Sequence, residues 1–345
     1  MTSKPFRKTR ARAPLRLGLA GGGTDLSPYC DTFGGAILNA TIDRYAFASI
    51  IPRTDGHVVF EADDIGVSET FALGAPLHAE LVLHKGVYER MIADYNGGDP
   101  LPVTIKTTVD APAGSGLGSS SSLVVALVDG FRSVLGAPLG NYDVAKLAFD
   151  IERVDLGLSG GRQDQYAAAF GGINYIEFLR EDRVIVNPLR VPDAICNELE
   201  SSLVICFSGR SRSSAAIIDQ QKSGLNASND KTLDAMHQLK SDAAEMKRAL
   251  LVGDIDLMAE ILNHSWKAKK ATAAAVSNPA LDSMFDLAMA NGALAGKVSG
   301  AGGGGFMFFL AHPENRYRLI EALNAGGGHA SPVKLTERGS ETWQY

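Results

Sequence analysis

The sequence predicts a mixed α/β (α+β) protein of two domains, and three observations support this. Its 345 residues exceed the length of one typical domain. Strand patterns and helical patterns alternate along the chain, with glycine-rich loops at several junctions. The second half, with consecutive helices counted as one, follows the order β-α-β-β-α-β. We therefore expect a boundary near residues 190–200, with domains over 1–195 and 196–345.

Composition excludes several other classes of protein. Apolar residues make up 45% and charged residues 21%, which excludes wholesale disorder and fibrous repeats. The net charge of −6 offers no domain-wide basic surface, so nucleic acid is not expected as a partner. Three scattered cysteines fit a reducing compartment better than a disulfide framework or a zinc site. No apolar run is long enough to span a membrane, so we expect no membrane partner and a cytoplasmic location.

In the first domain, alternating or β-branched segments predict strands. They cover residues 12–19, 35–51, 58–60, 70–71 and 103–109, and a hairpin is expected over 173–191. Apolar residues at helical spacing predict helices. These cover 78–96, a segment beginning after Gly118, 141–156 and 166–170.

In the second domain, the helix boundaries are well marked. Gly253 is expected to end one helix, and Asn278-Pro279 to begin another as its N-cap and first residue. The expected elements are a strand over 203–207, helices over 213–222, 231–252, 255–275 and 279–290, strands over 294–298 and 306–310, a helix over 313–325 and a strand over 330–335. This order is typical of the ferredoxin-like arrangement.

The most informative segment is the loop Pro112-Ala-Gly-Ser-Gly-Leu-Gly-Ser-Ser-Ser-Ser122, between a predicted strand and a predicted helix. Free backbone N–H groups and the positive end of a helix dipole form an anion site, most often for phosphate. The loop lacks the Gly-Lys-Ser/Thr of a Walker A motif, and Ser119 departs from the dinucleotide fingerprint. A plain serine-capped loop is the alternative, but three glycines and four serines at one junction favour phosphate binding.

Two further glycine-rich segments are expected near a ligand. Lys297-Val-Ser-Gly-Ala-Gly-Gly-Gly-Gly305 separates two predicted strands, and its glycines leave room for a ligand or for another loop. The alternative is a floppy hairpin tip. Gly21-Gly22-Gly23-Thr24-Asp25 offers backbone groups, a hydroxyl and a carboxylate, as a hydroxyl-rich ligand such as a sugar requires. A turn in which Asp25 caps the following residues explains the same segment equally well.

Two carboxylates are candidates for chemistry. Glu152 falls among apolar residues at helical spacing, where a carboxylate is costly unless it is paired or bound to a metal. We favour a magnesium ligand over a structural ion pair or a position at the solvent-facing edge of the stripe. Asp164 precedes a predicted short helix and could simply cap it. The same position suits a general base, because a helix N-terminus keeps a carboxylate ionised.

Three segments together resemble the sequence motifs of the GHMP small-molecule kinases, which include galactokinase and mevalonate kinase. They are Arg12–Asp25, Pro112–Ser122 and Lys297–Gly305, and their order and spacing span nearly the whole chain. The resemblance implies the GHMP kinase fold, with an N-terminal ribosomal-protein-S5-like domain and a C-terminal ferredoxin-like domain. The run from Ala13 to Asp25, with Ser27-Pro28-Tyr29 and Gly35–Asp43 after it, resembles the kinases of heptose 7-phosphates. Galactokinases carry Gly-Glu-His-x-Asp there, and fucokinases differ around the corresponding glycines.

The resemblance also implies roles for residues of the phosphate loop and its surroundings. Residues expected to bind ATP are Pro112, Gly114, Ser115, Gly116, Leu117, Gly118, Ser119, Ser120 and Ser121. Ser120 and Glu152 would hold Mg²⁺, and Asp164 occupies the position of the catalytic aspartate. Arg16 lies where the superfamily places a cation that faces the transferring phosphoryl group.

The remaining expected site residues concern the acceptor. Gly22, Gly23, Thr24 and Asp25 would bind sugar hydroxyls, and Gly302 and Gly303 would also border the substrate. A sugar phosphate needs a cationic pocket, for which Arg210 and Arg212 at a strand-to-helix turn are candidates. Two solvated surface arginines are the alternative.

The expected activity is ATP-dependent phosphorylation of the anomeric hydroxyl of D-glycero-D-manno-heptose 7-phosphate to the 1,7-bisphosphate, for surface polysaccharide. One alternative is another sugar 1-kinase, such as a fucokinase-like enzyme, which would not need Arg210 and Arg212. A second is an ATP and sugar sensor without turnover. The presence of both Glu152 and Asp164 disfavours the sensor. A homodimer stays open.

Overall fold

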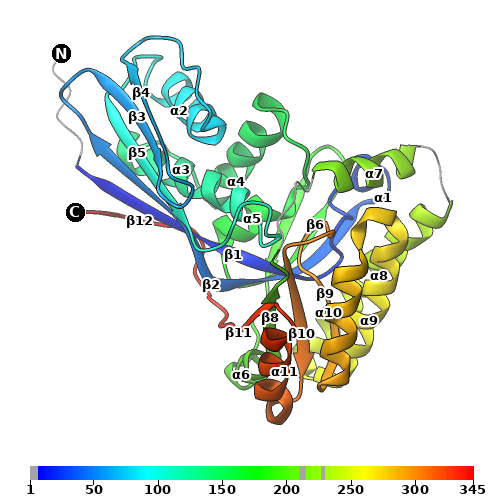
Figure 1. Ribbon diagram of the computed structural model, residues 1–345. Helices are drawn as coiled ribbons and strands as arrows, with labels where there is room; N and C mark the ends of the chain where they lie inside the picture. The colour runs from blue at the N-terminus through cyan, green and yellow to red at the C-terminus, as the bar shows by residue number, and fades with distance from the viewer. Residues whose placement is uncertain (1–6, 210–214, 227–229) are drawn as a thin grey trace.

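Two β-sheets, each packed against helices, organise the computed structural model, which describes residues 7–209, 215–226 and 230–345 (Figure 1). The first sheet has eight strands and the second has four. This arrangement confirms the predicted mixed α/β class. No helix in the described ranges is long and apolar enough to cross a membrane.

The first sheet is built around one long strand that pairs on both of its edges. β2 (Gly35–Pro52) pairs with β1 (Thr9–Ala20) along one edge. Along the other edge it pairs with β6 through its first part and with β5 through its last part. The other strands of the sheet are β3 (His57–Ala62), β4 (Val67–Ala72), β5 (Val103–Val109), β6 (Ile173–Phe178), β7 (Val184–Pro188) and β12 (Glu341–Gln344).

Helices of the first half pack on this sheet and on one another. α3, an apolar helix, contacts both β1 and β2, and its residues Val124, Leu127, Val128 and Phe131 are fully buried. The helical elements are α1 (Tyr29–Phe33), α2 (Val82–Tyr95), α3 (Ser119–Leu135), α4 (Asn141–Asp150), the π-helical turn η1 (Ile151–Asp155) and α5 (Gln163–Phe170). α6 (Asp193–Ser202), at the predicted domain boundary, packs on helices of the second half. The helix predicted over 141–156 therefore ends as an α-helix at Asp150 and continues as a π turn.

The second sheet confirms the predicted ferredoxin-like order. Its strands lie in the order β11-β8-β10-β9, and every neighbouring pair is antiparallel. They are β8 (Leu203–Phe207), β9 (Ala293–Val298), β10 (Phe306–Ala311) and β11 (His329–Pro332). The helical elements are α7 (Ala215–Asn226), α8 (Asp230–Val252), α9 (Ile255–Thr272), the 3₁₀ turn η2 (Ala274–Val276), α10 (Pro279–Ala290) and α11 (Pro313–Ala325). Asn278 caps α10 as predicted, because its side-chain oxygen accepts the N–H groups of Ala280 and Leu281.

The end of the chain returns to the first sheet, which the sequence did not indicate. β12 pairs antiparallel with β1, and Figure 1 shows the red C-terminal strand beside the blue first strand. The four residues of β12 carry too short a pattern to predict a strand. The domain boundary between residues 195 and 196 stays a prediction. β12 crosses this boundary, because it follows the second domain in sequence but pairs with β1 in the first sheet.

One apolar cluster joins the two halves. Leu15, Leu17 and Leu19 of β1 share this cluster with residues of α8, α9 and β10, such as Met246 and Phe308. β1 is thereby buried on both faces, with α3 against one part and helices of the second half against another. The position of residues at the end of β1 is therefore fixed by both halves together.

The second and third glycine-rich segments touch one another. A Cβ added to Gly300 would lie 2.8 Å from the Cα of Gly116, and one added to Gly305 would lie 2.3 Å from the carbonyl oxygen of Ser115. That carbonyl accepts the N–H of Phe306 at 2.7 Å. At these two positions the glycines make room for another loop, which is one of the two explanations expected from the sequence.

Gly305→Ala is expected to destabilise this contact strongly. Gly305 has a φ of +79°, and its Cβ would collide with the Ser115 carbonyl, so both strain and overlap are added. We expect the free energy of unfolding to fall by about 3 kcal/mol or more, measured by urea denaturation. Gly327→Ala is the matched control, because Gly327 has a φ of +86° and nothing within 4 Å of the added Cβ. It should cost only about 1–2 kcal/mol, and equal losses in the two variants would contradict the contact.

Candidate active site

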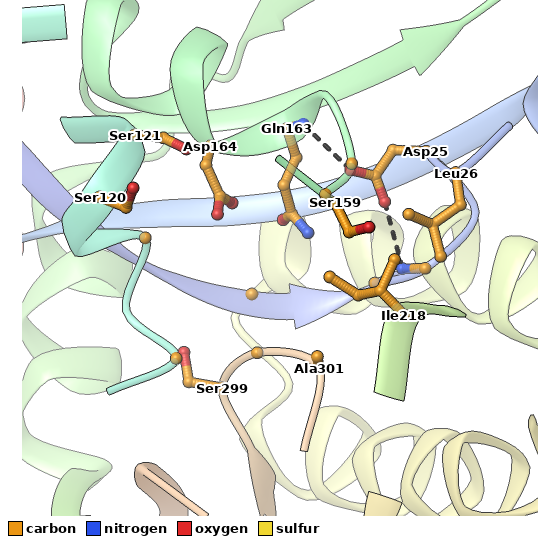
Figure 2. Close-up of a pocket in the computed structure, with 18 of the residues that line it drawn as sticks. Asp25, Leu26, Ser120, Ser121, Ser159, Gln163, Asp164, Ile218, Ser299 and Ala301 are labelled. Atoms are coloured by element: carbon orange, nitrogen blue, oxygen red, sulfur yellow. Dashed lines mark hydrogen bonds between the residues drawn. The ribbon is translucent and has the colours of Figure 1, made fainter. Parts of the chain in front are cut away.

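A pocket of about 320 Å³ collects the glycine-rich segments and the two candidate carboxylates. Figure 2 shows Ser120, Ser121 and Asp164 toward one end and Asp25 and Leu26 toward the other. The lining includes Arg16, Gly18, Gly22, Gly23, Asp25, Gly114, Gly116, Gly118, Ser119, Ser120, Ser121, Glu152, Ser159, Gln163, Asp164, Ile218, Lys269, Lys297, Ser299, Gly300 and Ala301. Most of the residues expected from the sequence therefore surround one cavity.

The phosphate loop opens into this pocket at the start of α3. Gly114, Gly116 and Gly118 have φ values of +71°, +81° and +79°, a region that L side chains rarely adopt. Gly118 directly precedes the helix, whose first turn holds Ser119, Ser120 and Ser121. The unpaired N–H groups of that turn and the helix dipole would favour an anion there, and the phosphate site stays a prediction.

Three of the residues expected to bind ATP do not line the pocket. They are Pro112, Ser115 and Leu117, and they support the loop on the side away from the pocket. Ser115 and Leu117 are fully buried. The carbonyl of Leu117 accepts the N–H of Arg16 at 3.0 Å, and that of Pro112 accepts the N–H of Ser115 at 3.1 Å. Their contribution is to hold the loop backbone.

Glu152 lies in the π-helical turn, and its side chain is fully buried. Ser120 Oγ donates to Glu152 Oε1 at 3.0 Å, and Gln165 Nε2 donates to Glu152 Oε2 at 2.5 Å. Gln165 Nε2 also lies 3.1 Å from Ser121 Oγ. Arg153 is more distant, with 3.7 Å between its Nη1 and Glu152 Oε1. The carboxylate is thus held against the first turn of α3 at a π turn, a feature often found at functional sites.

This pair fits the magnesium site of a nucleotide-binding enzyme. In the described part of the chain, no three His, Cys, Asp or Glu residues come together as a metal site. Mg²⁺ in nucleotide sites needs fewer protein ligands, because phosphate oxygens and water complete its octahedron. The Ser120 hydroxyl and the Glu152 carboxylate, side by side at the pocket, are oxygen ligands of the required kind.

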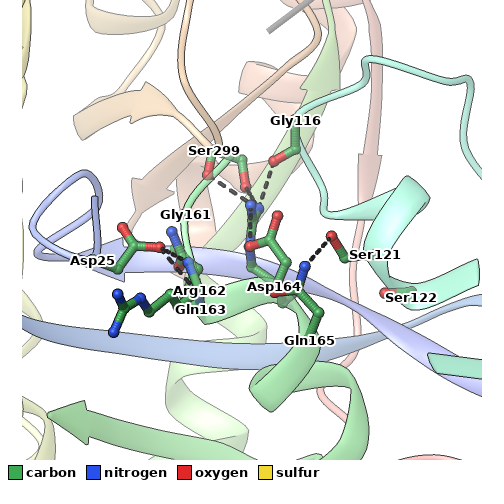
Figure 3. A network of polar contacts seen from close by, with 12 residues as sticks. Asp25, Gly116, Ser121, Ser122, Gly161, Arg162, Gln163, Asp164, Gln165 and Ser299 are labelled. Atoms are coloured by element: carbon green, nitrogen blue, oxygen red, sulfur yellow. Dashed lines mark hydrogen bonds and ion pairs between the residues drawn. The ribbon is translucent and has the colours of Figure 1, made fainter. Parts of the chain in front are cut away.

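The Arg16 guanidinium connects four segments at the centre of the pocket. Its Nε and Nη2 each lie 2.8 Å from Asp164 Oδ1. Its Nη1 donates to the carbonyl oxygens of Gly116 at 2.5 Å and Ser299 at 3.2 Å. Figure 3 shows Asp164, Gly116 and Ser299 converging on this point. The Arg16 side chain is only 5% exposed, and that of Asp164 is 22% exposed toward the pocket.

The segment Gly21–Asp25 has features of both explanations given above, a border of the ligand pocket and a turn in which Asp25 caps the backbone. Asp25 lines the pocket, yet its Oδ2 accepts the N–H groups of Arg162 at 2.7 Å and Gln163 at 3.0 Å, so it holds the start of α5 beside Asp164 (Figure 3). Thr24 is fully buried, and its hydroxyl lies within hydrogen-bond distance of the carbonyls of Gly21 and Ala36. The Thr24 hydroxyl therefore fastens the turn to β2 and faces away from a ligand.

Other expected acceptor residues lie elsewhere. Gly303 donates its N–H to the carbonyl of Val276 at 2.7 Å, and a Cβ on Gly302 would lie 2.5 Å from the same oxygen. Both glycines pack on η2, while Ser299, Gly300 and Ala301 line the pocket. Arg210 and Arg212 fall outside the described residues.

Two buried lysines in the pocket were missed by the sequence analysis. Lys269 Nζ donates to the Gly22 carbonyl at 2.8 Å, and Lys297 Nζ to the Gly18 carbonyl at 2.6 Å. Burial lowers the pKa of Lys269 to about 8 and, with the positive charge of Lys269 adding to it, that of Lys297 to about 7. Lys297 begins the third motif, which was a usable signal. Lys269 stands among other lysines on α9, and nothing in the sequence separates it from exposed ones.

Comparison with known proteins decides the family. Residues 82–172 match the model for the GHMP kinases N terminal domain, and residues 246–329 match GHMP kinases C terminal. The chain is 45% identical to the D-glycero-alpha-D-manno-heptose 7-phosphate kinase of Campylobacter jejuni over 344 residues, which cover 98% of this chain and 100% of that protein. The chain belongs to the GHMP kinases. These enzymes are ATP-dependent phosphotransferases, as the resemblance of the three motifs implied for this GHMP kinase.

Two other relatives of this GHMP kinase are informative. A crystal structure described as a D-glycero-D-manno-heptose 1-phosphate kinase from Bacteroides thetaiotaomicron superposes with a TM-score of 0.83 at 42% identity, covering 98% of this chain and 99% of that one. The bifunctional fucokinase/GDP-fucose pyrophosphorylase of Arabidopsis thaliana is 26% identical over 91% of this chain and 31% of its own length. The similarity to the heptose phosphate kinases thus extends over whole chains.

Lys297→Met is expected to weaken the dependence of this GHMP kinase's stability on pH. Burial lowers the pKa of Lys297 to about 7, below its ordinary 10.5, so the unfolded chain binds more protons than the folded one between pH 7 and 9. The free energy of unfolding therefore rises with pH in this window, by about 2 kcal/mol from this group. Urea denaturation at pH 7 and 9 should show that the variant lacks this increase. Lys267→Met, at an exposed position on α9, should retain it, and equal increases in all proteins would contradict the burial argument.

Proposed function

We propose that this GHMP kinase transfers the γ-phosphoryl group of ATP to the anomeric hydroxyl of D-glycero-D-manno-heptose 7-phosphate. The observation that carries the reaction is the Arg16–Asp164 pair, which lies beside the start of α3 and faces the pocket. The 45% identity to a heptose 7-phosphate kinase over the whole chain supports the choice of acceptor. The product would be the 1,7-bisphosphate, an intermediate for surface polysaccharide.

The phosphates of ATP would bind to the first turn of α3. The left-handed glycines of the loop let its backbone approach the phosphates closely, and the serine hydroxyls add donors. Ser119 and Ser121 border the pocket from this turn, with Gly116 and Gly118 before them. This cradle fixes the γ-phosphorus relative to Asp164, because Gly118 lies next to the Asp164 carboxyl group.

Asp164 would accept the proton of the anomeric hydroxyl as that oxygen forms its bond to the γ-phosphorus. The bond between the γ-phosphorus and the bridging oxygen breaks, and ADP leaves with the electron pair. Arg16 holds the Asp164 carboxylate with two nitrogen atoms and offsets negative charge on the transferred group. Asp25 fixes the backbone at the start of α5 and so positions Asp164.

Ser120 and Glu152 would hold Mg²⁺, and Gln165 keeps the Glu152 carboxylate turned toward Ser120. When bound, Mg²⁺ neutralises the charge of the β- and γ-phosphates. Glu152 is fully buried, so its orientation depends on these hydrogen bonds and on the π turn.

The acceptor would lie between Asp164 and the first glycine segment. Gly22, Gly23 and Asp25 border this end of the pocket and offer backbone and carboxylate oxygens to sugar hydroxyls. A role for Arg210 and Arg212 at the substrate phosphate, a cytoplasmic location and a homodimer stay predictions.

Wild-type enzyme with MgATP is expected to release ADP with heptose 7-phosphate and much more slowly with unphosphorylated acceptors. The panel is D-glycero-D-manno-heptose 7-phosphate, mannose 6-phosphate, mannose, fucose and galactose. A preference for the phosphorylated sugars supports the proposed acceptor. Turnover on free fucose would favour a fucokinase-like enzyme. ATP binding without turnover on any of these sugars would overturn the proposed acceptor and favour a sensor.

Asp164→Asn is expected to bind MgATP within about threefold of wild type but to lose roughly 10²- to 10⁴-fold in kcat, because the amide cannot accept the proton. Turnover is followed by ADP release, and nucleotide binding by calorimetry. Asp150→Asn is the matched control, since Asp150 pairs with Lys146 and does not line the pocket. Near-wild-type turnover in Asp164→Asn would remove this residue from the mechanism.

A further inference from the structure

The pocket contains more positive charge than phosphoryl transfer explains. Four cationic side chains line it, those of Arg16, Arg153, Lys269 and Lys297, and Arg16 and the two lysines are each only 4% exposed. Arg16 has a carboxylate partner in Asp164, and Arg153 lies 3.7 Å from Glu152. Neither lysine has a carboxylate within 4.0 Å among the ion pairs of the described residues. Two buried ammonium groups are thus left without a paired anion.

Each ammonium group also retains hydrogen-bonding capacity. An ammonium carries three donors, and the described contacts use one on each lysine, to the Gly22 and Gly18 carbonyls. The nearby carboxylates are already engaged. Asp25 accepts hydrogen bonds from backbone N–H groups at the start of α5. Asp242 accepts hydrogen bonds from Ser265 Oγ and Gln238 Nε2, each at 2.7 Å. Since both lysines line the pocket, their remaining N–H groups are available to a bound molecule.

The electrostatics favour an anion at this position. Burial is the main reason that the pKa values of Lys269 and Lys297 fall to about 8 and about 7. The charge of Arg16 lowers both pKa values further, while Asp25 acts in the opposite direction on Lys269 and Asp242 on Lys297. A doubly negative group close to both would offset the desolvation of two ammonium ions. Phosphate provides that charge and several acceptor oxygens in a compact group.

The ammonium groups of the two lysines contact the end of β1 and the glycine turn that follows it. Arg16 and Gly18 are two residues apart on the same face of the strand, about 7 Å along it, and the glycine turn follows farther on. Lys297 is anchored at Gly18 and Lys269 at Gly22. The phosphate loop, in contrast, meets Asp164 at Gly118. An acceptor with its anomeric hydroxyl at Asp164 would therefore extend its other end toward the lysines.

We propose that Lys269 and Lys297 form the subsite for the phosphate group that the acceptor sugar already carries. This inference rests on the proposed function and names the residues that select a phosphorylated acceptor. The Lys269 and Lys297 ammonium groups donate to the phosphate oxygens, while the Gly22 and Gly18 carbonyls keep both side chains in place.

The test compares Lys269→Met and Lys297→Met with wild type on two acceptors that differ only in the phosphate. These are D-glycero-D-manno-heptose 7-phosphate and the unphosphorylated heptose, at saturating MgATP. We expect kcat/KM for the 7-phosphate to fall roughly 10- to 100-fold in each variant, and that for the free heptose to change by less than about threefold. Calorimetric binding of the 7-phosphate without nucleotide should weaken by a similar factor, and Lys269→Arg should recover part of it.

Lys270→Met is the matched control. Lys270 follows Lys269 on α9, but its side chain is 42% exposed and its ammonium lies 3.8 Å from Asp282. It should keep both wild-type kcat/KM values. Thermal unfolding of every variant checks that the fold is retained.

The outcomes separate this inference from the function beneath it. Equal losses on both acceptors would mean that the lysines only fix the backbone of β1 and its glycine turn, and would overturn the subsite. A rise confined to the KM for ATP would assign the lysines to the nucleotide and would also overturn it. A wild-type enzyme with no preference for the phosphorylated sugar would instead refute the proposed function, and the subsite with it.

Discussion

The buried guanidinium of Arg16 is the interaction on which the site depends. A cation removed from water is stable only where enough acceptors surround it. Here the acceptors come from three other segments, Asp164 at the start of α5, Gly116 in the phosphate loop and Ser299 after β9. The requirement to satisfy one charge thus determines how closely three loops approach. The start of α5, the phosphate loop and the third glycine segment are brought together by the group that, in the proposed mechanism, faces the transferred phosphoryl.

Glycine makes this convergence sterically feasible. Gly116 and Gly300 face each other so closely that a methyl group on Gly300 would overlap the opposite backbone. Gly161 has the same role beneath Asp25, where an added Cβ would lie 2.0 Å from a carboxylate oxygen. The glycine-rich segments that the sequence analysis expected near a ligand therefore serve a second purpose. They let loops pack on each other and on a carboxylate, so that the pocket is lined by backbone as well as by side chains.

Much of this could be predicted from sequence because the relevant signals are local. Helix spacing, caps and strand alternation predicted most elements, and the glycine and serine pattern identified a loop that lines the pocket at the start of α3. What could not be predicted depends on tertiary contacts. The π turn at Glu152 has no distinct sequence pattern, and β12 is recognisable only beside β1. Thr24 appeared suited to a sugar, but its hydroxyl contacts the backbone carbonyls of Gly21 in the turn and Ala36 in β2.

Lys269 shows most clearly where local reasoning ends. On α9 it is one of several lysines, yet it is buried while its neighbour Lys270 remains exposed. Burying two ammonium groups without a carboxylate in direct contact lowers stability, and the hydrogen bonds to the Gly22 and Gly18 carbonyls use one donor on each. Departures of this kind from the rules of folding are expected where function demands them. Lys269 and Lys297 line the same cavity as Arg16 and Asp164, so in the proposed subsite a bound anionic acceptor would offset the stability lost by burying them.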